Sequence, residues 1–139
     1  MFGILVVTHG TMAEGIVDSL EMIMGNQEQL KALSFKPGDD INSLGEDIQN
    51  SIKILDTGEG VLVLVDLFGA SPYNQAAMSK KELPNNDYRL VTGVSLPMLI
   101  EACSQRHMGK VIGEAYTVVI ESAKDGVKEF FELLEERNK

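Results

Sequence analysis

The chain has 139 residues, which suits one compact domain covering residues 1–139, and 44% of them are hydrophobic, enough for a core without a metal. A net charge of −9 argues against nucleic-acid binding through phosphate contacts, and the single cysteine, Cys103, excludes an intrachain disulfide and indicates a reducing compartment. No basic signal-peptide start and no run of roughly 20 apolar residues is present, so we expect a soluble, cytoplasmic protein.

The chain begins with a strand–helix pattern. Residues 2–8 form a continuous apolar run rich in Ile and Val, which predicts a strand covered on both faces. Thr11 and Glu14 have capping-box spacing and predict a helix start. Gly25, followed by Asn26, predicts the end of that helix. Its apolar residues at helical spacing are Ile16, Val17, Leu20, Ile23 and Met24.

Two further strand–helix pairs follow along the chain. Residues 29–35 predict a second strand, and residues 41–55 predict a second helix with an apolar face. Residues 61–66 form the strongest strand pattern of the chain and end on the carboxylate of Asp66. Ser71-Pro72, an N-cap residue type before a proline at the first helical position, predicts a helix over about 72–80.

The last third of the chain is less regular. Residues 87–92 predict a fourth strand, and residues 95–107 predict a helix. Residues 109–122 are helical or mixed, and residues 126–137 form an amphipathic, charged tail. A short strand within residues 111–128 is an alternative, because Gly113 and Gly126 interrupt the helical pattern.

This alternation predicts an α/β fold. We expect a doubly wound, mainly parallel sheet of four strands in the order 2-1-3-4, flanked by helices, with an extra C-terminal antiparallel edge strand as the alternative. Cys103 is expected in or at the edge of the core and His107 on the surface. The methionines expected to fill the core are Met22, Met24, Met78 and Met98.

The carboxyl ends of the strands are the expected place of the functional site. Ligands of open parallel sheets bind there, at the point where the strand order reverses, which lies here between the first and third strands. The first strand ends at His9 and the third at Asp66, so both side chains should open onto the same crevice. A carboxylate that accepts a hydrogen bond from one imidazole nitrogen leaves the other nitrogen as a nucleophile.

An anion site is predicted beside this pair. The helix that starts at Ser71 offers free N–H groups and the positive end of its dipole. Gly69 and Ala70 allow the backbone to approach a ligand, and the Ser71 hydroxyl can add a hydrogen bond. With Gly10 after the histidine, these are the candidate phosphate-binding residues, and His9 and Asp66 are the candidate catalytic ones.

Metal and nucleotide sites are not predicted. Two histidines and one cysteine, far apart, make no zinc site, and no P-loop or dinucleotide-binding motif occurs. We therefore expect no cofactor, and a phosphoryl group that arrives from another protein.

Three stretches resemble the motifs of one family, in the same order. Residues 3–10, 60–74 and 92–99 are similar to motifs of mannose-family IIA components of the bacterial phosphoenolpyruvate-dependent sugar phosphotransferase system. The resemblance implies that His9 takes a phosphoryl group from the phosphocarrier protein HPr, that Asp66 hydrogen-bonds this histidine, and that Ser71 helps to bind phosphate. It also implies transfer to a separate IIB component, which serves membrane IIC and IID proteins, and a homodimer, often formed by exchange of a C-terminal strand.

Four alternatives stay open. A related family with the same fold supplies phosphate to dihydroxyacetone kinase. A receiver domain phosphorylated on Asp66 would need an acidic pair after the first strand to hold magnesium. A histidine phosphatase would need arginines near His9 to clamp its substrate. A flavin-binding module would need aromatic walls, for which only Phe68 and Tyr73 are candidates.

Overall fold

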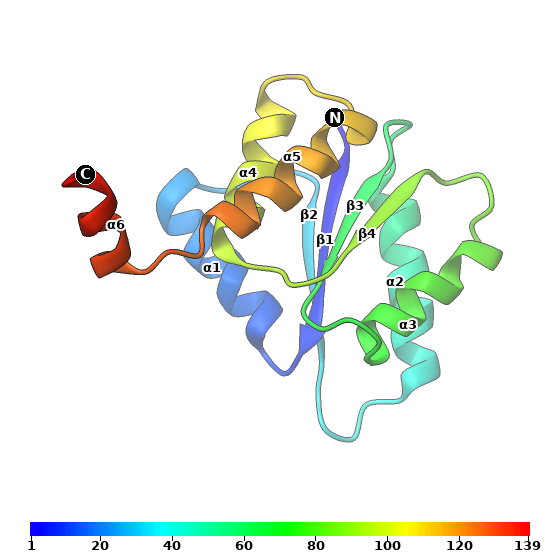
Figure 1. The fold of residues 1–139 in the computed structure, drawn as a ribbon. Helices are drawn as coiled ribbons and strands as arrows, with labels where there is room; N and C mark the ends of the chain where they lie inside the picture. Colours follow the sequence, from blue (N-terminus) through cyan, green and yellow to red (C-terminus); the bar gives the residue numbers. More distant parts are fainter.

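The computed structural model describes all 139 residues and shows a four-stranded parallel sheet with helices on both faces (Figure 1). The strands lie in the order β2-β1-β3-β4, which confirms the predicted doubly wound fold and its strand order. Their bounds are Gly3–His9 for β1, Leu30–Phe35 for β2, Val61–Val65 for β3 and Tyr88–Val91 for β4.

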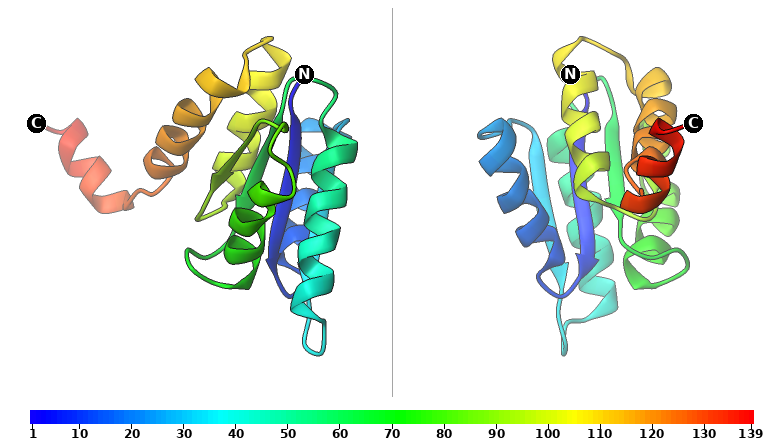
Figure 2. Two further views of the ribbon diagram at one scale, coloured as in Figure 1. Left: turned by 90° about the vertical axis from the view of Figure 1, so that its right-hand side faces the viewer. Right: turned by 60° about the vertical axis from the view of Figure 1, so that its left-hand side comes forward.

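Helices cover the sheet from two sides. One face is covered by α1, α4 and α5, and the other by α2 and α3 (Figures 1 and 2). The helices are α1 (Met12–Met24), α2 (Ile41–Leu55), α3 (Ser71–Met78), α4 (Leu96–His107), α5 (Ile112–Asp125) and α6 (Phe130–Arg137), and a 3₁₀ turn at Ser79–Lys81 follows α3. None of the helices has the length and apolarity that crossing a membrane would require.

The core has two halves because alternate residues of each central strand face opposite sides of the sheet. Ile4 and Val6 of β1 pack under α1, α4 and α5, whereas Leu5 and Val7 pack under α2 and α3. All four side chains are fully buried. Both faces of the sheet are therefore apolar, which explains why the strand pattern shows no polar alternation.

The C-terminal part differs from the predicted alternative. Residues 112–125 form α5, whose Ile112, Ala115 and Val119 recur at helical spacing and pack into the core. The extra antiparallel strand within residues 111–128 is therefore wrong, and β4 stays at the edge of the sheet. α6 buries no residue and projects away from the body of the molecule (Figure 2).

The start of α1 is capped differently from the prediction. The capping box is wrong, because Thr11 lacks the extended backbone of an N-cap residue and its side chain makes no capping hydrogen bond. The Thr8 hydroxyl accepts the hydrogen bond of the Ala13 N–H instead, at 2.7 Å. The Glu14 carboxylate accepts from the Ser34 hydroxyl at 3.1 Å, which ties α1 to β2.

The cysteine and the methionines follow the predicted burial only in part. Cys103 and Met98 are buried as predicted, and Met24 packs against the core. Met22 and Met78 are 86% and 58% exposed, so the prediction that they fill the core is wrong. Both lie on faces of their helices that point away from the sheet, so neither side chain packs into the core.

Candidate phosphoryl-transfer site

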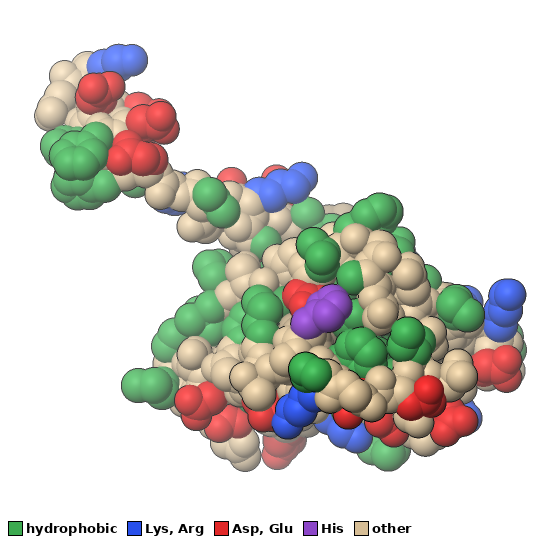
Figure 3. All heavy atoms as spheres, turned by 90° about the horizontal axis from the view of Figure 1, so that it is seen from below, with side chains coloured by type: hydrophobic (Ala, Val, Ile, Leu, Met, Phe, Trp, Pro, Cys, Tyr) green, Lys and Arg blue, Asp and Glu red, His purple; other side chains and the backbone are tan.

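His9 and Asp66 lie side by side at the carboxyl ends of β1 and β3. The parallel register pairs Val7 with Val65, so the ends of the two strands meet although the two residues are 57 positions apart. The His9 ring nitrogen Nδ1 lies 2.8 Å from Asp66 Oδ2, and the same oxygen accepts the His9 backbone N–H at 2.9 Å. Seen from this end of the molecule, a histidine stands next to a carboxylate amid apolar side chains (Figure 3).

The electrostatics of the pair set the state of the histidine. Burial alone would raise the pKa of Asp66, but the two hydrogen bonds from His9 and the charge of its ring outweigh it and hold that pKa below its ordinary value. Asp66 is thus an anion at neutral pH, and Nδ1 is the nitrogen that carries the proton. The His9 side chain is 46% exposed against 15% for Asp66, which leaves Nε2 as the free nitrogen.

The backbone around His9 is held from both sides. Gly10 has φ +58°, a left-handed conformation that favours glycine, and its N–H donates to the Phe35 carbonyl at 2.7 Å. The Phe35 ring meets the His9 ring edge-on, with centroids 6.2 Å apart. The roles of Phe35 and Thr8 were missed by the sequence reasoning. The polar Thr8 at the end of an apolar run was the one available signal.

The residues of the predicted anion site lie at the start of α3. Ala70 is the N-cap, with an extended backbone, so Ser71 is the first helical residue and not the cap that its type suggested. The N–H groups of Gly69, Ala70 and Ser71 have no acceptor in the structure. Gly69 has φ +78°, and the Asn74 side-chain amide donates to its carbonyl at 3.0 Å, a contact that the sequence reasoning did not identify.

The remaining polar candidates lie elsewhere. His107 is exposed at the end of α4, as predicted. The Arg106 guanidinium is buried and donates to the Phe2 and Gln29 carbonyls. These two residues directly precede β1 and β2, at the end of the sheet opposite to His9. Arg89 lies over the Tyr116 ring. No arginine clamps the His9 site, which disfavours a histidine phosphatase, and no group of side chains has the composition of a metal site.

A half-buried aspartate that orients a histidine, beside free N–H groups at a helix start, is an arrangement suited to carrying a phosphoryl group. The model of the EIIA-man family, the PTS system fructose IIA component, matches residues 3–120. The chain belongs to this family. The family is thus the one that the three sequence motifs of this IIA chain resemble.

Two relatives of this IIA chain illustrate the match. The chain is 35% identical over 125 residues to the PTS system mannose-specific EIIAB component of Escherichia coli K12, which covers 90% of this chain and 38% of that protein. It is 35% identical over 106 residues to the PTS system fructose-specific EIIA component of Bacillus subtilis 168, covering 76% and 71%. The chain therefore spans less than half of the EIIAB relatives.

A solved structure supports the same assignment for this IIA chain. The crystal structure of phosphotransferase system component EIIA from Streptococcus agalactiae superposes with a TM-score of 0.87 at 30% sequence identity. The superposition covers 95% of this chain and 99% of that one.

Proposed function

We propose that this IIA chain carries a phosphoryl group on His9 between two proteins of a sugar phosphotransferase system. It accepts the group from phospho-HPr and passes it to a IIB component. The observation that carries this proposal is the 2.8 Å contact between His9 Nδ1 and Asp66 Oδ2, which presents Nε2 as the nucleophile.

The proposed transfer balances as a displacement at phosphorus. The lone pair of His9 Nε2 attacks the phosphorus, while the bond to the donor residue of HPr breaks and its electron pair leaves with the donor. The His9 ring, which keeps its proton on Nδ1, becomes positively charged, and Asp66 stabilises that charge. The phosphoryl oxygens accept hydrogen bonds from the free N–H groups of residues 69–71, with Gly10 and the Ser71 hydroxyl close by.

The partners follow from this role. The IIB component receives the group and phosphorylates the sugar during its uptake through the membrane IIC and IID proteins. The chain works in the cytoplasm and forms a homodimer. Its negative charge suits phosphocarrier partners with basic surfaces.

Labelled phosphoenolpyruvate, enzyme I and HPr test the proposal. Wild type is compared with His9→Ala and with His107→Ala, which removes the only other histidine, an exposed one. We expect label on wild type and His107→Ala and none on His9→Ala. The label should be lost in acid and kept in base, as for a phosphohistidine, and it should move to added IIB.

Each other result points to a different function. A base-labile label, or one that persists in His9→Ala, would indicate phosphorylation of Asp66 in a receiver-like role. Transfer to dihydroxyacetone kinase in place of IIB would assign the chain to that branch. No label on the folded wild type would refute the proposal.

A further inference from the structure

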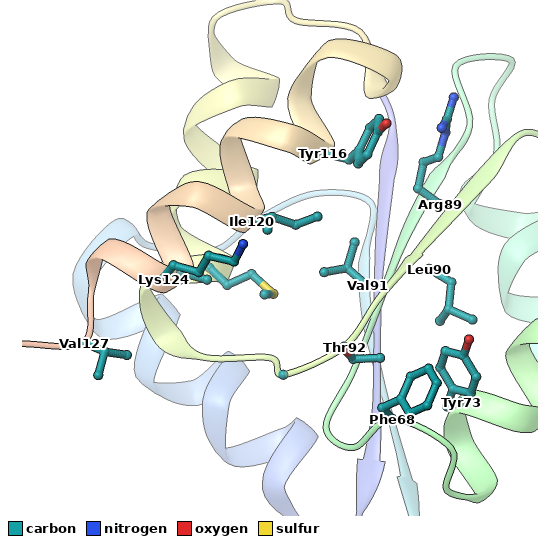
Figure 4. Close-up of a pocket in the computed structure, with 13 residues that line it drawn as sticks. Phe68, Tyr73, Arg89, Leu90, Val91, Thr92, Tyr116, Ile120, Lys124 and Val127 are labelled. Atoms are coloured by element: carbon teal, nitrogen blue, oxygen red, sulfur yellow. The ribbon is translucent and has the colours of Figure 1, made fainter.

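The loop between β3 and α3 has few contacts that hold it in one shape. Leu67 and Phe68 are 60% and 73% exposed, so neither side chain anchors the loop in the core. The Phe68 ring packs against the Tyr73 ring beside β4, with centroids 4.9 Å apart (Figure 4). That contact restrains residue 68 but not the backbone that follows it. The shape of the rest of the loop therefore depends on the hydrogen bonds of its backbone.

Asn74 supplies those hydrogen bonds. The backbone of residues 67–70 takes part in two hydrogen bonds, and Asn74 donates both. Its side-chain Nδ2 donates to the Gly69 carbonyl at 3.0 Å, and its backbone N–H donates to the Ala70 carbonyl at 2.9 Å. The bond to Ala70 belongs to the first turn of α3, and any residue except proline would make it. The bond to Gly69 depends on the asparagine side chain alone.

Each of the two carbonyls belongs to a peptide unit whose other end is a free N–H. The Gly69 carbonyl shares its plane with the Ala70 N–H, and the Ala70 carbonyl shares its plane with the Ser71 N–H. In a trans peptide the C=O and N–H bonds point in opposite directions, and the chain has no cis peptide. A hydrogen bond from Asn74 to the carbonyl end of a peptide therefore turns its N–H end away from Asn74. Neither N–H has an acceptor in the structure.

The peptide between Gly69 and Ala70 is the one that most needs this restraint. It turns about ψ of Gly69 and φ of Ala70, and glycine permits more backbone conformations than any other residue. Gly69 has φ +78°, and a Cβ added there would meet no atom within 4 Å, so this glycine serves the conformation of the loop and not close packing. Without the Asn74 side chain, no hydrogen bond keeps this peptide from turning over.

We propose that Asn74 is a positioning residue for phosphoryl transfer, whose side-chain amide fixes the 69–70 peptide with the Ala70 N–H turned toward the phosphoryl group on His9. The proposal rests on the proposed function, in which the N–H groups of residues 69–71 bind the phosphoryl oxygens. Asn74 itself does not touch the phosphoryl group. Its hydrogen bond to Gly69 exists before the group arrives, so the donor needs no reorientation during transfer.

The variant Asn74→Leu tests this role, because leucine has a similar size but no hydrogen-bond donor. Asn50→Leu, which adds the same side chain at an exposed position of α2, is the matched control. Residual dipolar couplings of the amide N–H groups, measured before phosphorylation, report the orientation of each peptide. Amide proton shifts on phosphorylation report which N–H groups bind the phosphoryl oxygens. Single-turnover acceptance from phospho-HPr gives the saturating rate and the half-saturating concentration.

The expected effect of Asn74→Leu is confined to one peptide. The dipolar coupling of Ala70 should fall toward zero, whereas that of Ser71 should keep its wild-type value, because the backbone N–H of residue 74 still holds the 70–71 peptide. On phosphorylation the Ala70 amide proton should move downfield in wild type and much less in the variant. The saturating rate should fall about 3- to 10-fold, which equals about 0.7–1.4 kcal/mol and is the size of one neutral hydrogen bond.

The half-saturating concentration of phospho-HPr should stay within about twofold of wild type, because the restraint acts in the transfer step and not in docking. Asn50→Leu should match wild type in every measurement.

Three results would overturn the proposal. The first is an Ala70 coupling that is the same in Asn74→Leu as in wild type. The second is a saturating rate within about twofold of wild type although that coupling has collapsed. The third is a raised half-saturating concentration with an unchanged saturating rate, which would assign Asn74 to the docking of HPr. If wild type takes no label, the proposed function fails, and the dipolar couplings still decide whether Asn74 fixes the 69–70 peptide.

Discussion

The substitution Asp66→Asn tests the central pair. Asp66 Oδ2 accepts two hydrogen bonds from His9, and the amide oxygen of asparagine can accept the same two, since turning the NH₂ group toward His9 would set donors against donors. The tautomer of His9 and the fold should therefore survive, and the loss should be that of the negative charge.

The size of the effect follows from the strength of that bond. A hydrogen bond to a charged group contributes about 1.5–3 kcal/mol and a neutral one about 0.5–1.5 kcal/mol, so each of the two bonds to Asp66 should lose about 1–1.5 kcal/mol with the charge. Because the His9 side chain is 46% exposed, water screens the charge, and we take about 1.5–2 kcal/mol for the two bonds together. Phosphoryl acceptance should then slow about 10- to 30-fold, at 1.36 kcal/mol for each tenfold.

The assay is a single-turnover measurement of label transfer from phospho-HPr, with circular dichroism as the check on folding. Asp18→Asn, at an exposed position of α1, is the matched control and should transfer like wild type. If folded Asp66→Asn transferred within twofold of wild type, the role of this carboxylate in stabilising the positive charge of His9 would be refuted.

Two further predictions concern stability. Burial would raise the pKa values of Asp56 and Asp66, but hydrogen bonds lower both pKa values below the ordinary value of about 3.9. The two carboxylates therefore contribute stability above about pH 3.9, and this stability is lost as the pH falls through their pKa values in the folded protein. Urea midpoints measured from pH 6 to pH 3 should fall most steeply below about pH 4, and less so in Asp56→Asn; equal slopes would contradict this. A Cβ added at Gly3 would lie 2.7 Å from Leu55 Cβ and 2.8 Å from its carbonyl oxygen, so Gly3→Ala should destabilise by about 1–3 kcal/mol in urea denaturation. Gly15→Ala, in open space on α1, is the control and should stabilise by about 0.5–1 kcal/mol; equal effects at the two glycines would show that the packing argument is wrong.

Local signals predicted most of the elements. The continuous apolar runs of β1 and β3 and the periodic face of α2 identified their elements closely, and α2 has the predicted bounds, Ile41–Leu55. Each of these patterns arises because one or both faces of the helix or strand are buried, and the spacing of apolar residues in the sequence shows this directly. Capping was harder to predict, because a hydroxyl five residues before Ala13 replaced the nearer Thr11. Which side chain reaches a free N–H depends on backbone angles that residue type does not specify.

The C-terminal segment shows the limit of local patterns. α5 and α6 both have amphipathic sequences, yet α5 packs on the core and no residue of α6 is buried. The apolar face of a helix predicts that it needs a partner but not which surface supplies it.

The sequence by itself determined the α/β fold, the ends of the first and third strands, and the residue types that stand there. The sequence placed His9 and Asp66 at strand ends because each of them follows directly on an apolar run and is followed within a few residues by a glycine. Only the tertiary structure decided that the two meet at 2.8 Å through Nδ1, which leaves Nε2 free. That contact joins residues 57 positions apart and depends on strand register, which is set by packing across the whole sheet.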